Sequence, residues 1–189
     1  YLYNLQNKSK KLVKEQEIPS GHNSDDYIVE RVEYKSHDGR LVPLTITRHK
    51  KTKIDGSANL LLYGYGSYGS SMSPNFSSTR LSLINRGIIW ATAHVRGGME
   101  KGMKWWKEGK LTNKKNTFED YICAAKYLID EKYSSKGKII GMGGSAGGLL
   151  MGAVVNQAPE LFLGIIMAVP FVDSLTTNLD HSLPLTVGE

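Results

Sequence analysis

Short apolar runs alternate with helix-like patterns through most of the chain. The runs are rich in β-branched and aliphatic residues, whereas the segments between them repeat apolar residues at the three- and four-residue spacing of an amphipathic helix. Strands are predicted at 59–63, 88–94, 138–142 and 164–169, and helices near 76–85, 118–132 and 147–156. Strand and helix in alternation indicate an α/β fold, with a mostly parallel sheet and helices on both faces.

The first quarter of the chain has a different pattern. Short strands joined by polar turns are predicted at 1–5, 11–15, 27–34 and 41–48. Asp38-Gly39 supplies the positive φ of a tight hairpin turn, and 19–26 is rich in Pro, Gly, Ser, Asn and Asp, as linkers are. The expected division is therefore an N-terminal piece with its linker in 1–26 and the α/β domain in 27–189.

Two helix ends carry recognisable signals. Thr117 and Asp120, three residues apart at the start of the second helix, predict a capping box. Gly87 follows the first helix, at a position where a helix C-terminus favours glycine.

The third long strand runs directly into Gly143-Gly144-Ser145-Ala146-Gly147 and then into a helix. Gly-x-Ser-x-Gly between a strand and a helix is typical of a nucleophile elbow, in which the serine adopts a strained backbone and side chains at the flanking glycines would collide with neighbouring elements. The turn presents the Ser145 hydroxyl at the carboxyl edge of the sheet. The backbone N–H of Ala146 then points where an oxyanion would form.

Two other interpretations of this turn are open. It could be a glycine-rich turn whose serine has no chemical role. It could also be a dinucleotide fingerprint, Gly141-x-Gly143-x-x-Ala146, but that motif belongs to the first βα unit and needs a carboxylate at a strand end about 20 residues on, which the chain lacks.

The loop after strand 59–63 reads Gly64-Tyr65-Gly66-Ser67-Tyr68-Gly69. A phenol on a glycine-hinged loop can donate a hydrogen bond to an oxyanion. Composition alone favours the other interpretation, in which these tyrosines are packing residues.

Five motifs, in order along the chain, decide between these interpretations. They are the loop at 63–69, His94-Val95-Arg96-Gly97-Gly98, the segment 116–121, the glycine turn at 143–148 and the segment 169–173. Their order and spacing resemble the catalytic domain of the prolyl oligopeptidase family of serine peptidases. The tail, 179–189, resembles the oligopeptidase B (protease II) branch of that family in particular.

The resemblance implies an incomplete α/β-hydrolase fold preceded by the last strands of a β-propeller, to which 1–15 would belong. It implies that Ser145 is the nucleophile. The Tyr65 hydroxyl and the Ala146 N–H would form the oxyanion hole.

For substrates, the resemblance implies short peptides cut after Arg or Lys. The first carboxylate of the pair that selects the basic side chain falls on Glu189, and Tyr68 is expected to contact substrate as well. The proline-cleaving branch places a tryptophan in the tail region, and Trp90, Trp105 and Trp106 all lie elsewhere.

The chain also departs from the family pattern. Met99 stands where a third glycine usually follows Arg96-Gly97-Gly98, so the loop before Lys101 could have another shape. The family's catalytic Asp and His follow the serine at positions beyond 189, and Asp173 is expected to be structural. The histidines are not expected to replace the missing base: four precede the serine and the fifth lies in the tail motif, at His22, His37, His49, His94 and His181.

The expected function is therefore a serine endopeptidase, present as a fragment that is inactive and unstable by itself. A complementing C-terminal fragment is the partner that would complete its site. The alternative is a catalytically dead remnant or split-gene product without hydrolase activity of its own.

Composition narrows the setting. Cys123 is the only cysteine, which excludes an internal disulfide, and no metal site or cofactor is expected. No apolar run reaches the roughly 18 to 20 residues of a membrane span, and the start lacks a secretory pattern, so a cytoplasmic protein is expected. The net charge of +6 is spread over short lysine runs with no nucleic-acid motif, so nucleic acid is not an expected partner.

Overall fold

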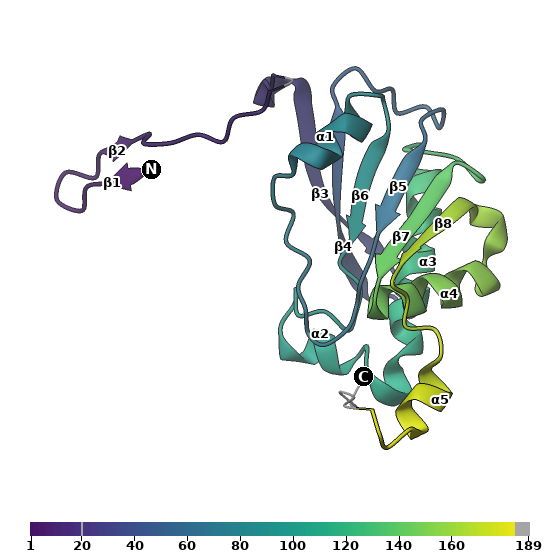
Figure 1. The fold of residues 1–189 in the computed structure, drawn as a ribbon. Helices are drawn as coiled ribbons and strands as arrows, with labels where there is room; N and C mark the ends of the chain where they lie inside the picture. Colours follow the sequence, from purple (N-terminus) through teal and green to yellow (C-terminus); the bar gives the residue numbers. More distant parts are fainter. Residues whose placement is uncertain (20, 184–189) are drawn as a thin grey trace.

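A six-stranded sheet forms the centre of the molecule in the computed structural model, which describes residues 1–19 and 21–183 (Figure 1). Its strand order is β3-β4-β6-β5-β7-β8. The strands are β3 (Tyr27–Lys35), β4 (Leu41–His49), β5 (Leu60–Tyr63), β6 (Ile89–Ala93), β7 (Ile139–Gly144) and β8 (Phe162–Ala168). β5 to β8 pair in parallel, whereas β3 and β4 are antiparallel to each other and β4 is antiparallel to β6. The predicted α/β sheet is confirmed, and the β3–β4 hairpin lies at one edge of it.

The helices cover both faces of this sheet. Figure 1 shows α1 on one side and α3 with α4 on the other. They are α1 (Ser78–Ile84), α2 (Met103–Lys107), α3 (Lys115–Asp130), α4 (Ala146–Gln157) and α5 (Ser174–Leu179), with 3-10 turns η1 (Ser24–Asp26), η2 (Leu111–Asn113) and η3 (Pro159–Leu161). The three predicted helices are confirmed with shifted ends, and α2 and α5 were not predicted. In the described part of the chain, no helix is long and apolar enough to cross a bilayer.

The core lies between the central strands and the α3–α4 pair. Leu60 and Leu62 of β5 and Leu128 of α3 are fully buried. Small residues let the helices approach the sheet: a Cβ on Gly141 of β7 would lie 3.2 Å from the Tyr121 hydroxyl oxygen. That hydroxyl donates a hydrogen bond to the Leu62 carbonyl, so the phenol is buried without an unsatisfied donor.

The predicted capping box is wrong. α3 begins at Lys115 and its N-cap is Lys114, so Thr117 and Asp120 lie within the helix. Both side chains bond to Arg96 on a neighbouring loop instead of to the helix end. The expectation for Gly87 is confirmed, because its φ is +85° and its N–H donates to the Ile84 carbonyl at 3.0 Å.

The first residues form a separate pair of very short strands, β1 (Leu2–Tyr3) and β2 (Lys10–Lys11), drawn away from the main sheet in Figure 1. Their side chains are exposed. A hairpin this short is marginal in water without further strands or a packing partner. The domain boundary after residue 26 and the membership of 1–15 in a β-propeller stay predictions.

Candidate active site

Ser145 is the only residue between β7 and α4, and it has φ 54° and ψ −118°. The expected strain at this serine is confirmed, because L residues rarely adopt a positive φ. Its N–H donates to the Ala168 carbonyl at 2.9 Å, and its own carbonyl accepts from Gly148 and Phe171, each at 2.9 Å. The side chain is exposed and makes no capping bond to α4. Hydrogen bonds therefore fix the backbone of Ser145, while its hydroxyl stays accessible to solvent.

The flanking glycines are required sterically, as expected. A Cβ on Gly143 would overlap the Gly147 carbonyl and come within 3.0 Å of the Gly64 carbonyl oxygen. A Cβ on Gly147 would lie 2.9 Å from the same oxygen. Real Cβ atoms do not approach backbone oxygens this closely, so the start of α4 packs against the residues after β5 only because both positions are glycine.

Tyr65 comes from those residues after β5. The Gly64 N–H donates to the Met142 carbonyl at 3.1 Å, which ties the start of this loop to β7. A Cβ built on Gly147 would lie 3.3 Å from Tyr65 Cδ2, so the half-buried phenol ring packs against the first turn of α4. Ala146 is the first residue of that helix, and its N–H has no acceptor within the helix. The structure thus brings Tyr65, Ser145 and Ala146 together.

The two predicted substrate-binding residues are not joined to this group. Tyr68 is 48% exposed with φ 58°, and in the described part of the chain no hydrogen bond links it to Ser145. Glu189 lies outside the described residues.

His94 is buried in a structural network. Arg31 Nη1 lies 3.0 Å and Thr45 Oγ1 2.8 Å from His94 Nε2. Because a guanidinium only donates, Nε2 accepts and Nδ1 carries the proton, facing Glu100 Oε1 at 3.5 Å. Across residues 1–19 and 21–183, no hydrogen bond joins any histidine to Ser145.

Asp173 is structural, as expected, because it caps α5 by accepting a hydrogen bond from the Thr176 N–H at 3.1 Å. The residues that the structure describes contain no cluster of three or more His, Cys, Asp or Glu side chains fit to hold a metal ion.

The sequence did not reveal that Arg96 is buried beside the site. Its side chain is 2% exposed and pairs with Asp120 and Asp38, at 2.6 Å to each. Burial alone lowers the pKa of a guanidinium, but the hydrogen bonds from Arg96 to the two carboxylates outweigh it and raise the Arg96 pKa above its ordinary value. Met99, where the family usually has glycine, packs its methyl against Gly69, at the end of the Tyr65 loop.

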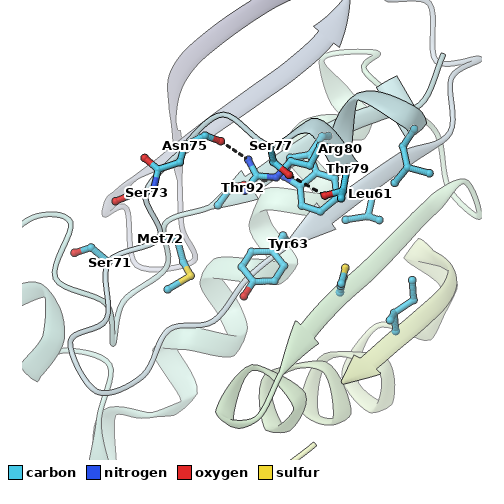
Figure 2. Close-up of a pocket in the computed structure, with 14 residues that line it drawn as sticks. Leu61, Tyr63, Ser71, Met72, Ser73, Asn75, Ser77, Thr79, Arg80 and Thr92 are labelled. Carbon is cyan, nitrogen blue, oxygen red and sulfur yellow. Dashed lines mark hydrogen bonds between the residues drawn. The ribbon is translucent and has the colours of Figure 1, made fainter. Parts of the chain in front are cut away.

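A cavity of about 740 Å³ lies over the sheet face beneath α1 (Figure 2). Tyr63 and Trp90 stack along its floor with ring centroids 6.3 Å apart, and Arg80 lies over the Trp90 ring and donates to the Asn75 carbonyl at 3.1 Å. Neither Ser145 nor Tyr65 lines this cavity. The cavity therefore lies over the face of the sheet, and its lining does not include the group formed by Tyr65, Ser145 and Ala146.

Residues 74–189 match the model of the prolyl oligopeptidase family. The chain belongs to this family. Among curated prolyl oligopeptidase relatives, the chain is 48% identical to dipeptidyl aminopeptidase BI of Pseudoxanthomonas mexicana over 190 residues, which cover 100% of this chain and 26% of the relative. It is 47% identical to Protease 2 of Moraxella lacunata over 186 residues, 98% of this chain and 27% of the relative. The chain thus spans about a quarter of the length of these relatives.

Solved structures of family members have the same fold. Oligopeptidase B from Leishmania major superposes with a TM-score of 0.90 at 44% identity, covering 96% of this chain and 25% of that one. Oligopeptidase B from Trypanosoma brucei, solved in a closed form with covalently bound antipain, gives a TM-score of 0.91 at 39% identity and covers 97% of this chain and 26% of that one. The predicted membership of the prolyl oligopeptidase family and its incomplete α/β fold are confirmed.

Proposed function

We propose that this chain supplies the nucleophile and the oxyanion-binding groups of a serine peptidase active site. The observation that carries the proposal is the backbone of Ser145, held at φ 54° between β7 and α4, with an exposed side chain beside the Ala146 N–H, which has no acceptor within the helix. Membership of the prolyl oligopeptidase family supports it. So does the covalent antipain in the similar Trypanosoma brucei enzyme.

The chemistry follows from this arrangement. Ser145 Oγ attacks the carbonyl carbon of the scissile peptide bond while its proton passes to a general base, and the carbonyl π electrons move to the oxygen. That oxyanion accepts hydrogen bonds from the Ala146 N–H and the Tyr65 hydroxyl. When the tetrahedral intermediate collapses, the C–N bond breaks, the amine leaves with the proton that the base returns, and the acyl group stays on Ser145 as an ester. Water, deprotonated by the same base, then attacks this ester, and the C–O bond to Ser145 Oγ breaks with return of the proton to the serine.

The base in this proposal is a histidine oriented by a carboxylate, both supplied by a segment or chain outside residues 1–189. The described histidines have other partners or no bond to Ser145. A serine hydroxyl without a base is almost fully protonated at neutral pH and a poor nucleophile. Residues 1–189 alone are therefore expected to hydrolyse peptides at close to the background rate.

The proposed substrates are short peptides cut after Arg or Lys. The similarity to Protease 2 and to the two oligopeptidase B structures supports this choice. Glu189 pairs with the basic side chain, and Tyr68, exposed on the loop that carries Tyr65, contacts the peptide. A desolvated carboxylate favours guanidinium because the pair is bidentate and charge-assisted.

Peptide hydrolysis by the full-length gene product tests the reaction. We expect cleavage of short peptides that Ser145→Ala abolishes. Cleavage that survives Ser145→Ala would remove the serine from the mechanism.

Glu189→Gln tests the specificity, because it removes the charge and keeps the shape. We expect a large loss of kcat/KM on Arg and Lys peptides with little change on a neutral peptide. Glu160→Gln is the matched control: it makes the same charge change at an exposed residue of η3, at the amino end of β8 and thus at the opposite edge of the sheet from Ser145. Equal losses on basic and neutral peptides, or the same loss in the Glu160 variant, would exclude Glu189 from the pocket.

A further inference from the structure

The loop that carries Tyr65, residues 64–69, rests on a second loop, residues 95–98. The Gly69 N–H donates to the Gly97 carbonyl at 2.9 Å. A Cβ on Gly66 would lie 2.7 Å from Val95 Cγ2 and 3.0 Å from the Arg96 carbonyl oxygen, and a Cβ on Gly97 would overlap the Gly66 carbonyl. The two backbones are in direct contact, so the position of Tyr65 depends on where the second loop lies.

The second loop is itself fixed from α3. The buried carboxylate of Asp120 accepts hydrogen bonds from the Arg96 backbone N–H at 3.0 Å, from Nε at 2.9 Å and from Nη2 at 2.6 Å. Charge-assisted bonds of this kind in a buried site are strong and directional. These three bonds hold the 95–98 loop in a fixed position against α3.

Thr117, one turn before Asp120 on α3, contacts both loops. Its hydroxyl donates to the Arg96 carbonyl at 2.7 Å and lies 3.1 Å from the Gly109 carbonyl. Its methyl group packs directly against Gly66, and the side chain is fully buried. The sequence pattern assigned this threonine to a helix cap, but α3 starts before it and its side chain has no capping role.

We propose that Thr117 is a positioning residue for Tyr65. It joins the residue next to Tyr65 to the anchored 95–98 loop, and so sets where the phenol lies relative to Ser145. This inference rests on the proposed role of Tyr65 in the oxyanion hole. An oxyanion donor must lie within about 2.7–3.1 Å of the developing charge, and a displacement of about 1 Å can cost about 100-fold in rate.

Two substitutions test the hydroxyl and the methyl group of Thr117 separately. Thr117→Val keeps the methyl contact with Gly66 and removes the hydroxyl. Thr117→Ser keeps the hydroxyl bond to Arg96 and removes the methyl. In the full-length gene product we expect Thr117→Val to lower kcat about 10-fold or more with little change in KM, because misplacing an oxyanion donor acts on the transition state. We expect Thr117→Ser to lower kcat by less than Thr117→Val, because it keeps the hydrogen bond to the Arg96 carbonyl and loses only the methyl contact with Gly66.

Ser134→Ala is the matched control. Ser134 is also buried, and its hydroxyl donates to the Ala58 carbonyl at 2.8 Å, before the amino end of β5. Ser134→Ala therefore also removes a hydrogen bond from a buried hydroxyl to a backbone carbonyl, but at the amino end of β5, whereas Tyr65 follows its carboxyl end. We expect lower stability in this variant with unchanged kcat.

A double-mutant cycle with Tyr65→Phe distinguishes positioning from a general structural role. If Thr117 acts through the Tyr65 hydroxyl, Thr117→Val has little further effect on kcat once that hydroxyl is gone. A kcat loss of equal size in both backgrounds would overturn the proposal. So would an unchanged kcat in Thr117→Val with Tyr65 intact.

Hydrogen–deuterium exchange measures how stably the 64–69 loop is held, and it does not depend on catalytic activity. We expect peptides covering 64–69 to exchange faster in Thr117→Val than in the unaltered protein, and to be unchanged in Ser134→Ala. Unchanged exchange in Thr117→Val would overturn the positioning role even if peptides are hydrolysed. If the unaltered protein hydrolyses no peptide, the proposed function fails, and faster exchange still supports the positioning of the loop by Thr117.

Discussion

The two sides of the site are built in different ways. The serine side is one continuous segment, residues 143–148, formed by the glycine-rich end of β7, Ser145 and the glycine-rich start of α4. The tyrosine side, residues 64–69, is placed by contacts from several other parts of the chain, among them the 95–98 loop, Lys114 and Thr117. The nucleophile can thus be recognised from a local motif, even though Ala168 and Phe171 also bond to its backbone. The position of the oxyanion donor depends on packing between distant segments.

The serine and tyrosine sides also differ in which residues adopt a strained backbone conformation. Ser145 is held at positive φ by three backbone hydrogen bonds, and such a conformation costs about 1–3 kcal/mol. In the tyrosine loop, Gly66 and Gly69 take the left-handed conformation at little cost, and Tyr68 is the exception with φ 58°. The strained residue on the serine side is the one with the proposed chemistry.

The largest effect is expected at Ser145. In the full-length gene product, Ser145→Ala should lower kcat by about 10⁴-fold or more, because the attacking atom is lost. Ser145→Gly should be equally inactive but more stable by about 1 kcal/mol, since glycine adopts the positive φ without strain. Peptide hydrolysis and urea unfolding measure the two effects. A less stable glycine variant would show that the serine backbone is not strained.

Tyr65 should come next. Tyr65→Phe removes the hydroxyl and keeps the ring against α4, and should lower kcat by about 10²–10³ with little change in KM. Tyr68→Phe on the same loop is the comparison, because an exposed substrate contact should change KM more than kcat. Steady-state kinetics on one peptide give both values. If Tyr65→Phe raised KM with kcat intact, the hydroxyl would be a substrate contact and no oxyanion donor.

A glycine pair tests the serine side by stability alone. Gly143→Ala forces a Cβ onto the Gly147 carbonyl and should destabilise the fold by about 1–3 kcal/mol or more. Gly164→Ala on the neighbouring strand β8 meets nothing within 4 Å and should be neutral or stabilising by about 0.5 kcal/mol. Urea denaturation of both variants provides the comparison. Equal stability of the two would mean that the close approach at the elbow is not required.

The smallest effect is expected at Asp38, the outer partner of Arg96. Burial raises the pKa of this carboxyl, but hydrogen bonds from Arg96 and the Arg40 N–H outweigh it and hold the Asp38 pKa below its usual value. A carboxyl with a depressed pKa in the folded state stabilises the protein above its unfolded pKa and loses that contribution as the pH falls through the folded value. The contribution is therefore present at neutral pH and disappears below about pH 4.

Asp38→Asn should cost only about 0–1 kcal/mol at pH 7, since the Asp38 side chain is 35% exposed and its ion pair is screened by water. It should also flatten the decline in stability below pH 4. Urea unfolding between pH 7 and pH 2.5 measures both. A cost at pH 7 as large as that of Gly143→Ala would show that the outer ion pair is a main support of the 95–98 loop.

Much of the fold was predictable because it rests on local signals. The alternation of apolar runs and helical patterns predicted β5 to β8 and the three longer helices, and the glycine spacing predicted the strain at Ser145. The short helices α2 and α5 were missed because a few residues carry little periodicity. The membership of the β3–β4 hairpin in the main sheet depends on pairing between β4 and β6, which no local pattern encodes.

The tyrosine side was predictable only through family resemblance. Composition favoured a packing role for Tyr65, and its place beside α4 depends on glycines far away in sequence. The predicted capping box at Thr117 and Asp120 was wrong for the same reason. The local pattern was present, but both side chains form hydrogen bonds with Arg96, which is buried and comes from another loop. Burial of Arg96 itself could have been suspected only from its place between a strand end and two glycines.

Covalent labelling tests directly whether Ser145 is an activated nucleophile. The full-length gene product is treated with an organophosphonate selective for activated serines and digested, and the adduct is located by mass spectrometry. We expect one adduct, on Ser145, that is absent in Ser145→Ala and forms more slowly in Tyr65→Phe. An adduct on another residue, or none on Ser145 in a preparation that cleaves peptides, would contradict it.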